Sequence, residues 1–406
     1  TRYVDPALGF AIGWNYWLNW AITLAVEVVA GALVMKFWFP DTPAILWSAI
    51  FILILFTLNY LSTRAYGESE YVFASIKVAM VVIFLIIGTL LIFGVIGDGS
   101  PGFTNWTRDD APFVGGFNSI IGIFMIAAFS FQGTELVGIA AGESENPRKN
   151  VPKAINNVFW RILLFYIGTM IVIGFLLPYT DDNLLKTGVE SVAVSPFTLA
   201  LHRTGFTAAA SLMNFVILTA VLSCGNSGLY ASTRMLYAMA EEGKAPKCFA
   251  KVNKRGVPLN ALLITTAFGL LAFLTSLIGE GTAYTWLLNL SGMTGFVVWL
   301  GIAICHYRFR RAFKAQGKDP KELIYRAACF PFGVFLALIL CIIVILGQNY
   351  GAFTGSEIDW NGAIATYIGI PIIMVFYFWY KWKHHTKLIP LKEIDLSRPA
   401  YKNEEE

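Results

Sequence analysis

The sequence predicts an all-α protein that crosses a membrane many times. Hydrophobic residues make up 56% of its 406 positions and charged residues only 14%, whereas soluble domains carry about 25% charged residues. The apolar residues fall into long runs, and a helix needs about 20 such residues to cross a bilayer core. Lys and Arg are concentrated in some connecting loops and scarce in others, which is the charge pattern of a polytopic membrane protein.

Ten apolar runs are predicted spans, and together they form one transmembrane domain over residues 1–381. The first run is too long for a cleavable signal peptide and has no basic leader. Residues 382–406 are charged and contain proline, so we expect a disordered cytoplasmic tail. The predicted spans cover residues 10–35, 44–61, 71–96, 115–141, 159–178, 206–233, 258–278, 283–305, 329–347 and 362–381.

The distribution of positive charge predicts the orientation. With ten spans, both termini lie on one side of the membrane. The loops on that side, with the termini and Arg64, hold 24 of the 30 Lys and Arg residues, and the opposite loops hold four. Positively charged loops stay in the cytoplasm, so we expect cytoplasmic termini and a place in the cell (inner) membrane. The net charge of +4 follows from this bias and gives no reason to expect a nucleic acid partner.

The run 115–141 is the most informative stretch. It has about 27 residues, or roughly 40 Å as one helix, which is more than a bilayer core requires. A polar insert at Gln132–Glu135 interrupts it. We therefore predict non-helical backbone within Phe131–Glu135, which a membrane tolerates only where it lines a cavity. A carboxylate such as Glu135 at membrane depth is a functional candidate. The alternative is a tilted continuous helix whose Glu135 bonds a neighbouring helix.

The first span carries a polar stripe. Asn15, Asn19, Thr23 and Glu27 follow one another at steps of four, then comes Gly31. Each step drifts by about 40°, so the stripe winds slowly around the helix. Hydrogen bonding between helices could explain the two asparagines, but an acid such as Glu27 costs more to bury.

Two further spans contain polar residues. In the third span, Lys77 either extends to the cytoplasmic surface or is a buried ammonium that can exchange a proton. The eighth span opens with small and polar residues around Ser291 and Thr294, which indicates an irregular helix or tight packing. In the sixth span one helical face combines packing and pocket residues, namely Ser223, Asn226, Ser227 and Tyr230.

Several function classes find no support. The five cysteines have no CxxC spacing and the four histidines no ligand spacing, so we expect neither disulfide nor metal site. There is no GxSxG motif and no pair of aspartates inside a span, so an intramembrane enzyme is not expected. No span shows the filter or charge ring of a channel, and no cofactor is expected.

One segment carries a family resemblance. Phe131–Ile139, followed by Gly142-Glu143 and Asn146-Pro147, resembles the amino acid permeases of the amino acid–polyamine–organocation superfamily. Within it the chain is most similar to the bacterial lysine-specific permeases, and the Gln-Gly-Thr-Glu form also resembles fungal basic amino acid permeases. The resemblance runs over nearly the whole chain. Further matching stretches are Val221–Arg234, Ser291–Phe296, Cys305–Arg311 and Leu346–Tyr350.

The resemblance implies a LeuT-like fold, in which two inverted repeats of five spans hold the substrate near the membrane midplane. It also implies twelve spans in the family. This sequence begins where the family's third span begins, so we expect ten of the twelve spans here, with the first two absent.

The resemblance also implies a substrate site at the helix break. Phe129 would be an aromatic gate, and the carbonyl groups of Ser130 and Gln132 would accept hydrogen bonds from the substrate's α-ammonium. Lys77 and Glu135 match positions that the family uses for proton coupling.

The polar stripe suggests where a substrate side chain would lie. Our hypothesis is that Glu27 and Asn19, with Ser291 and Thr294 opposite, line that end of the pocket. The predicted substrate-binding residues are therefore Asn19, Glu27, Phe129, Ser130, Phe131, Gln132, Gly133, Thr134, Ser291 and Thr294.

The expected function is secondary active import of L-lysine with a proton. The sequence has no ATP-binding motif, so the energy would come from an ion gradient, and the partners would be L-lysine, protons and the lipid bilayer. Two alternatives stay open: a broader basic amino acid permease that also carries arginine or ornithine, and a sensor that binds an amino acid without moving it. Broken helices favour the transporter, because alternating access uses them.

Overall fold

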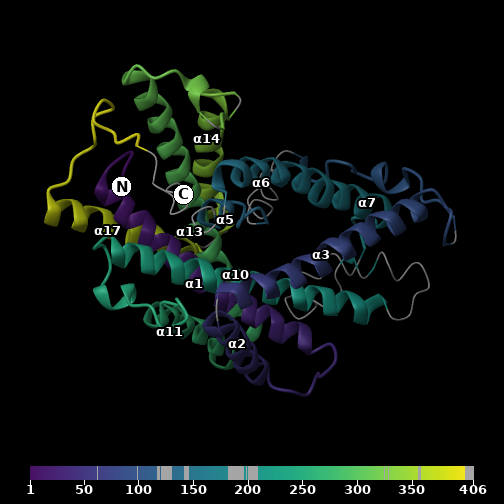
Figure 1. Ribbon diagram of the computed structural model, residues 1–406. Coiled ribbons are helices and arrows are strands. Elements are labelled where there is room, and N and C mark those ends of the chain that lie inside the picture. Colours follow the sequence, from purple (N-terminus) through teal and green to yellow (C-terminus); the bar gives the residue numbers. More distant parts are fainter. Residues whose placement is uncertain are drawn as a thin grey trace.

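The computed structural model is built from helices (Figure 1). It describes residues 1–61, 63–97, 99–116, 119, 130–140, 146–181, 196–197, 199, 209–323, 325–327, 329–354 and 358–397. No strand occurs among these residues. The predicted all-α class is therefore confirmed.

The helices fall into a long and a short group. The long ones are α1 (Pro6–Met35), α2 (Ala44–Leu61), α3 (Thr63–Ile92), α6 (Pro147–Arg161), α10 (Ala209–Glu241), α11 (Leu259–Gly269), α13 (Glu280–Ala315), α14 (Phe332–Gly347) and α17 (Gly369–His384). The short ones are η1 (Thr104–Trp106), α5 (Leu136–Ala140), η3 (Ile162–Ile167), α7 (Gly168–Leu176), η5 (Lys247–Ala250), η6 (Leu270–Leu274), α12 (Thr275–Ile278), η7 (Pro320–Glu322), α15 (Gly351–Thr354) and α16 (Trp360–Tyr367).

Most predicted spans have a counterpart in the structure. Seven stretches of the described chain are long and apolar enough to cross a membrane, and an eighth is the pair α16 and α17, which is bent by 41°. The ninth predicted span corresponds to α14, a shorter apolar helix. The predicted span 115–141 lies largely outside the described residues. The seven stretches are Pro6–Met35, Ala44–Leu61, Tyr66–Ile92, Lys149–Leu176, Ser211–Glu241, Leu259–Ile278 and Trp286–Ala315.

Helix α1 is the central helix. Its most apolar part is 83% buried inside the protein, more than that of any other membrane-spanning stretch of the described chain. It packs chiefly against α10 and α13 and also against α2, α11 and α17. Leu24 and Val28 of α1 lie in one apolar cluster with Leu55 of α2, Leu229 of α10 and Leu262 of α11. A helix that is buried on nearly every side can carry polar residues only where other helices bond them.

A second group of helices lies beside this core. On the right of Figure 1, α3 runs next to α7 and to the first half of α10. Met80, Phe84, Val172 and Met213 form the apolar cluster that holds them together. Lys77 is therefore carried by a helix that faces α10 rather than by one that faces lipid on all sides.

The tail is more ordered than its composition predicted. The Ile389 N–H donates to the carbonyl of Val4 at 2.9 Å, and Gln316 donates to the carbonyls of Leu391 and Ile394 at 3.2 and 2.7 Å. Ile394 is only 2% exposed. The prediction of disorder was wrong for residues 385–397, because a charged segment becomes ordered once its backbone and one apolar side chain find partners.

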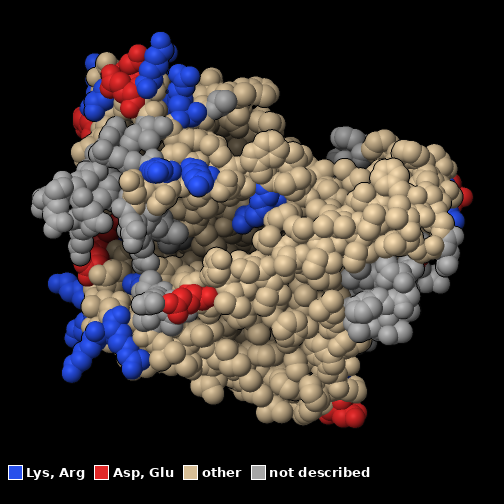
Figure 2. Space-filling model, turned by 45° about the vertical axis from the view of Figure 1, so that its right-hand side comes forward, with Lys and Arg blue, Asp and Glu red and all other residues tan. Residues whose placement is uncertain are grey.

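Charged side chains avoid much of the molecular surface. Figure 2 shows Lys and Arg gathered mainly towards one end of the molecule and a broad surface without charge beside it. In Figure 1, the N-terminus, the α10–α11 connection and the C-terminal end of α17 lie towards one side. A broad uncharged belt is what a surface in contact with lipid requires.

Candidate functional site

The predicted non-helical backbone is present at the position that we call the break, residues 130–135. Residues 130–135 form turns, and α5 begins only at Leu136. Gly133 has a φ of +96°, a conformation that glycine adopts at little cost and other residues avoid. The prediction of non-helical backbone within Phe131–Glu135 is therefore confirmed. The alternative of a continuous helix through these residues is excluded.

Asn19 of α1 connects the break to α13. Its Nδ2 donates to the Ser291 carbonyl at 2.6 Å and to Thr294 Oγ1 at 3.0 Å. Its Oδ1 accepts from Gln132 Nε2 at 2.8 Å. Asn19, Ser291 and Thr294 are fully buried. Four predicted binding residues from three separate segments thus form one hydrogen-bonded cluster.

Neighbouring residues of the stripe extend this cluster. The hydroxyls of Thr23 and Ser291 lie 2.6 Å apart, and Asn15 Nδ2 donates to the Thr294 carbonyl at 2.7 Å. Helix α13 runs without interruption through Ser291 and Thr294, so tight packing, and not an irregular helix, explains their small side chains. A Cβ at Gly295 would lie 2.2 Å from Gln132 Nε2, so a side chain at this position would displace the Gln132 amide that bonds Asn19.

Glu135 links the break to two helices. Its carboxylate accepts from Trp299 Nε1 at 3.0 Å, from the Tyr16 hydroxyl at 3.3 Å and from the Gly133 N–H at 3.0 Å. Tyr16 belongs to α1 and Trp299 to α13. The sequence analysis singled out neither residue. An aromatic residue in an apolar run gives no sign that its hydroxyl or indole N–H donates to a buried carboxylate.

Glu27 lies elsewhere. Its carboxylate accepts a hydrogen bond from the Cys224 side chain and is attracted by the positive charge of Lys77. The distance along the stripe explains this position: two steps of four residues rotate Glu27 by about 80° from Asn19. The side of α1 that meets Ser291 is therefore occupied by Asn19 and Thr23, and Glu27 turns towards α10.

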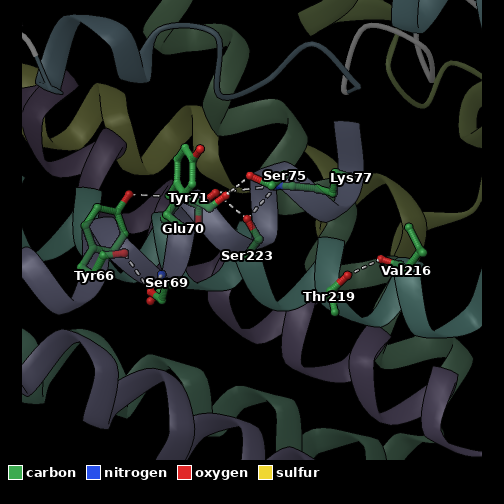
Figure 3. A network of polar contacts seen from close by, with 11 residues as sticks. Tyr66, Ser69, Glu70, Tyr71, Ser75, Lys77, Val216, Thr219 and Ser223 are labelled. Carbon is green, nitrogen blue, oxygen red and sulfur yellow. Dashed lines mark hydrogen bonds and ion pairs between the residues drawn. The ribbon is translucent and has the colours of Figure 1, made fainter. Parts of the chain in front are cut away.

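Lys77 points towards α10 (Figure 3). Its Nζ donates to Ser223 Oγ at 2.7 Å and lies 3.7 Å from Glu70 Oε1. The Ser223 hydroxyl donates to the same Glu70 oxygen at 2.5 Å. The Lys77 side chain is 34% exposed and that of Glu70 is 25% exposed. Glu70 precedes the predicted third span, but α3 includes it, and its spacing of seven residues places it on the same helix face as Lys77.

The other residues predicted at the break differ in their surroundings. Phe129 lies outside the described residues. The Ser130 carbonyl, predicted to accept from a substrate, accepts from the Tyr166 hydroxyl at 3.0 Å. Phe131 stacks on the Tyr166 ring with 5.0 Å between ring centroids. Thr134 lies in an open groove beside α6 and α13.

The polar face predicted on α10 packs against α2 and α3 and does not chiefly line a pocket. Asn226 accepts from Asn59 of α2 at 2.9 Å. The rings of Tyr230 and Tyr66 stack with 4.0 Å between centroids. Within the described chain, no three His, Cys, Asp or Glu residues are grouped as metal ligands.

These features define a class of protein. Many apolar helices surround a buried polar cluster at a helix break, the layout of a membrane transporter that binds a small polar molecule. The family model described as amino acid permease matches residues 1–391. The chain therefore belongs to the amino acid permease family, whose members are transporters and not enzymes, and it is a multi-pass membrane protein.

Several known permeases are similar in sequence to this chain over nearly its whole length. The lysine-specific permease LysP of Escherichia coli is 56% identical over 97% of this chain and 81% of its own length. LysP of Lactococcus lactis is 53% identical over 98% of this chain and 78% of its own length, and the histidine permease HisP of that organism is 49% identical over 98% and 83%. Among solved structures, a manganese transporter of Eremococcus coleocola matches with a TM-score of 0.49 and 16% identity, over 92% of this chain and 79% of its own.

Proposed function

We propose that this permease imports L-lysine together with a proton across the cytoplasmic membrane, with both of its termini in the cytoplasm. The two LysP relatives, at 56% and 53% identity, support lysine as the substrate. The concentration of Lys and Arg in the loops beside the termini supports the orientation. The tail and the N-terminal residues are hydrogen-bonded to each other, which is consistent with one location for both.

The main observation behind this proposal is the cluster of Asn19, Gln132, Ser291 and Thr294 at the helix break. An amino acid brings a carboxylate and an ammonium group, and each must regain hydrogen bonds when it leaves water. Residues 130–135 have backbone groups outside any helix, and the hydrogen bonds of the cluster hold these residues beside α1 and α13. The site therefore suits a small zwitterionic molecule.

The second ammonium group of lysine needs an acid or several oxygen atoms, since a desolvated unpaired charge costs several kcal/mol. Glu135 already accepts three hydrogen bonds beside the break. Glu27 shares one hydrogen bond with the Cys224 side chain. We assign Glu27 to the substrate's side-chain ammonium and Glu135 to proton coupling.

Lys77 is the second proton-coupling residue in this proposal. Its ammonium group lies between Glu70 and Ser223 on the contact of α3 with α10. A change in its protonation would alter the attraction between these two helices, because the partly buried carboxylate of Glu70 would lose its counter-ion. Proton exchange at Lys77 could thus be linked to a rearrangement of α3 against α10.

Transport by the full-length protein in liposomes tests the proposal. We expect an inward proton gradient to drive accumulation of labelled lysine, and we expect unlabelled lysine to compete better than arginine, ornithine or histidine. An uncoupler should abolish accumulation but leave counterflow. Lysine binding without counterflow would identify a sensor instead. Equal competition by histidine would contradict lysine specificity, a useful control because HisP is also a near relative.

A further inference from the structure

The Ser130 carbonyl has lost its backbone partner at the break. In an α-helix it would accept from the Thr134 N–H, and in a tighter helical turn from the Gly133 N–H. Here the Thr134 N–H donates to the Phe131 carbonyl at 3.4 Å. The Gly133 N–H donates to the Glu135 carboxylate at 3.0 Å. The Ser130 carbonyl therefore needs a donor from outside the break, because lipid cannot satisfy it.

Tyr166 supplies that donor. Its hydroxyl donates to the Ser130 carbonyl at 3.0 Å. Its ring stacks on that of Phe131, with 5.0 Å between the centroids and 19° between the planes. Tyr166 belongs to η3, which joins α6 to α7, and α7 packs against α3 (Figure 1). One side chain thus connects the break to the second group of helices.

The backbone of η3 determines where Tyr166 points. η3 is a π-helix, in which the Gly168 N–H donates to the Leu163 carbonyl five residues before it, one residue more than in an α-helix. The buried Thr169 hydroxyl donates to the Tyr166 carbonyl at 3.0 Å and also bonds the Phe165 carbonyl. Each residue of an α-helix turns by about 100°, so the extra residue changes the direction of the side chains in η3 relative to those of α6. Such π-helical turns are frequent at functional sites.

We propose that the Tyr166 hydroxyl occupies the place of the substrate's α-ammonium group on the Ser130 carbonyl and leaves it when an amino acid binds. This inference rests on the proposed function, in which an amino acid binds at the break. The ammonium group displaces the hydroxyl because hydrogen bonds from a charged donor are about twice as strong as those between neutral groups. When the substrate leaves, the hydroxyl returns, and the carbonyl keeps a partner in both states.

Binding by the full-length protein, measured by competition against a labelled amino acid, tests this proposal. Tyr166→Phe keeps the ring that stacks on Phe131 and removes the hydroxyl. We expect it to bind lysine about fivefold more tightly, the factor that corresponds to about 1 kcal/mol for one net hydrogen bond. We also expect a lower maximal rate of counterflow, because no protein group then replaces the leaving substrate. The matched control is Tyr71→Phe, which removes the hydroxyl of a side chain on α3 that is 76% exposed and should bind lysine normally.

The chemistry of the ligand distinguishes this role of Tyr166 from others. ε-Aminocaproate is lysine without the α-ammonium group, so its affinity should not change in Tyr166→Phe. Histidine has that group, so a permease that takes histidine instead of lysine should show the same gain with histidine, and lysine specificity can fail while this inference stands. Affinity is obtained from the concentration dependence, so a loss of folded protein does not alter it. Unchanged or weaker amino acid binding in Tyr166→Phe, or an equal gain for ε-aminocaproate, would overturn the proposal.

Discussion

At the scale of single residues, Asn19 uses both ends of its amide. Its nitrogen donates to α13 and its oxygen accepts from Gln132 at the break. A buried amide satisfied on both sides fixes the distance between the segments it joins, because a lost partner leaves a desolvated group that costs about 1–3 kcal/mol. The break is thus held in register with α1 and α13.

Glu27 gives the first prediction. Glu27→Gln should weaken lysine binding by about 2–5 kcal/mol, the usual cost of removing one partner of a desolvated charge pair. Norleucine, which keeps the apolar stem but lacks the side-chain ammonium, should lose much less. Competition against labelled lysine measures both affinities. If lysine and norleucine lose affinity equally, Glu27 interacts only with Lys77 and Cys224 and does not contact the substrate's ammonium group.

Lys77 gives the second prediction. Lys77→Met should stop the proton gradient from driving lysine accumulation, while exchange of internal for external lysine continues, because the substrate cluster lies on other residues. Uptake and counterflow in the same liposomes measure the two activities. Lys153→Met removes an exposed lysine of α6 and is the matched control. Normal accumulation against a gradient in Lys77→Met would refute the coupling role.

At the scale of elements, the break depends on backbone geometry. α5 can begin at Leu136 because the chain turns at Gly133, where φ is +96°. The Gly133 N–H then points at Glu135, and Glu135 bonds two helices. One glycine conformation thus positions both the turn at the break and the acid.

The third prediction tests this glycine. A Cβ at Gly133 would meet only ordinary contacts, the nearest being Trp20 at 3.5 Å, so Gly133→Ala adds backbone strain of about 1–2 kcal/mol and little steric clash. We expect lysine uptake to fall severalfold while the thermal unfolding temperature changes little. In Gly138→Ala the new Cβ meets nothing within 4 Å, so that variant should transport normally. Equal uptake by both variants would show that the turn is not needed.

At the scale of the whole molecule, the two ends of the described chain close on each other. Asp5 caps α1 through the Ala7 N–H at 2.8 Å and pairs with Lys381 of α17 at 3.1 Å. Arg308 of α13 donates to the carbonyl of Tyr3 at 2.7 Å and also bonds Ile389. The first and last segments of the described chain are thereby joined to each other and to α13.

The fourth prediction concerns acid. Burial raises the pKa of Asp5, but hydrogen bonds from Ala7 and Lys381 outweigh burial and hold the pKa below its usual value of 3.8. The negative charge of Asp5 therefore stabilises the fold at pH values above 3.8. This stabilisation is lost as the pH falls through the lowered pKa of Asp5. Asparagine caps helices as well as aspartate does, so Asp5→Asn removes the charge and keeps the cap.

Thermal unfolding in detergent measures the effect. Asp5→Asn should unfold at a lower temperature than the unmodified protein at neutral pH, and the difference should shrink in acid. Asp5→Ala should lose about a further 1 kcal/mol, since it also removes the cap. Asp41→Asn, an exposed residue between α1 and α2, should show neither change. A difference that is independent of pH would contradict the role of the charge.

The sequence by itself determined the class, most of the spans and the break. Hydropathy is a local property, so a run of apolar residues marks a span wherever its neighbours lie. A polar insert such as Gln132–Glu135 is also local, because lipid excludes it unless the protein needs it. Asn19, Ser291 and Thr294 could be predicted as partners for the same reason: buried polar residues in spans must bond one another.

Only the tertiary structure decided which partners those residues have. The orientation of Glu27 towards Cys224, the bond of Tyr166 to Ser130 and the ordering of Ile394 depend on how helices rotate and pack. Helix packing admits several crossing geometries for one apolar pattern. A side chain that extends several ångströms from its helix can therefore reach quite different neighbours in each geometry, and the sequence pattern of one helix does not distinguish among them.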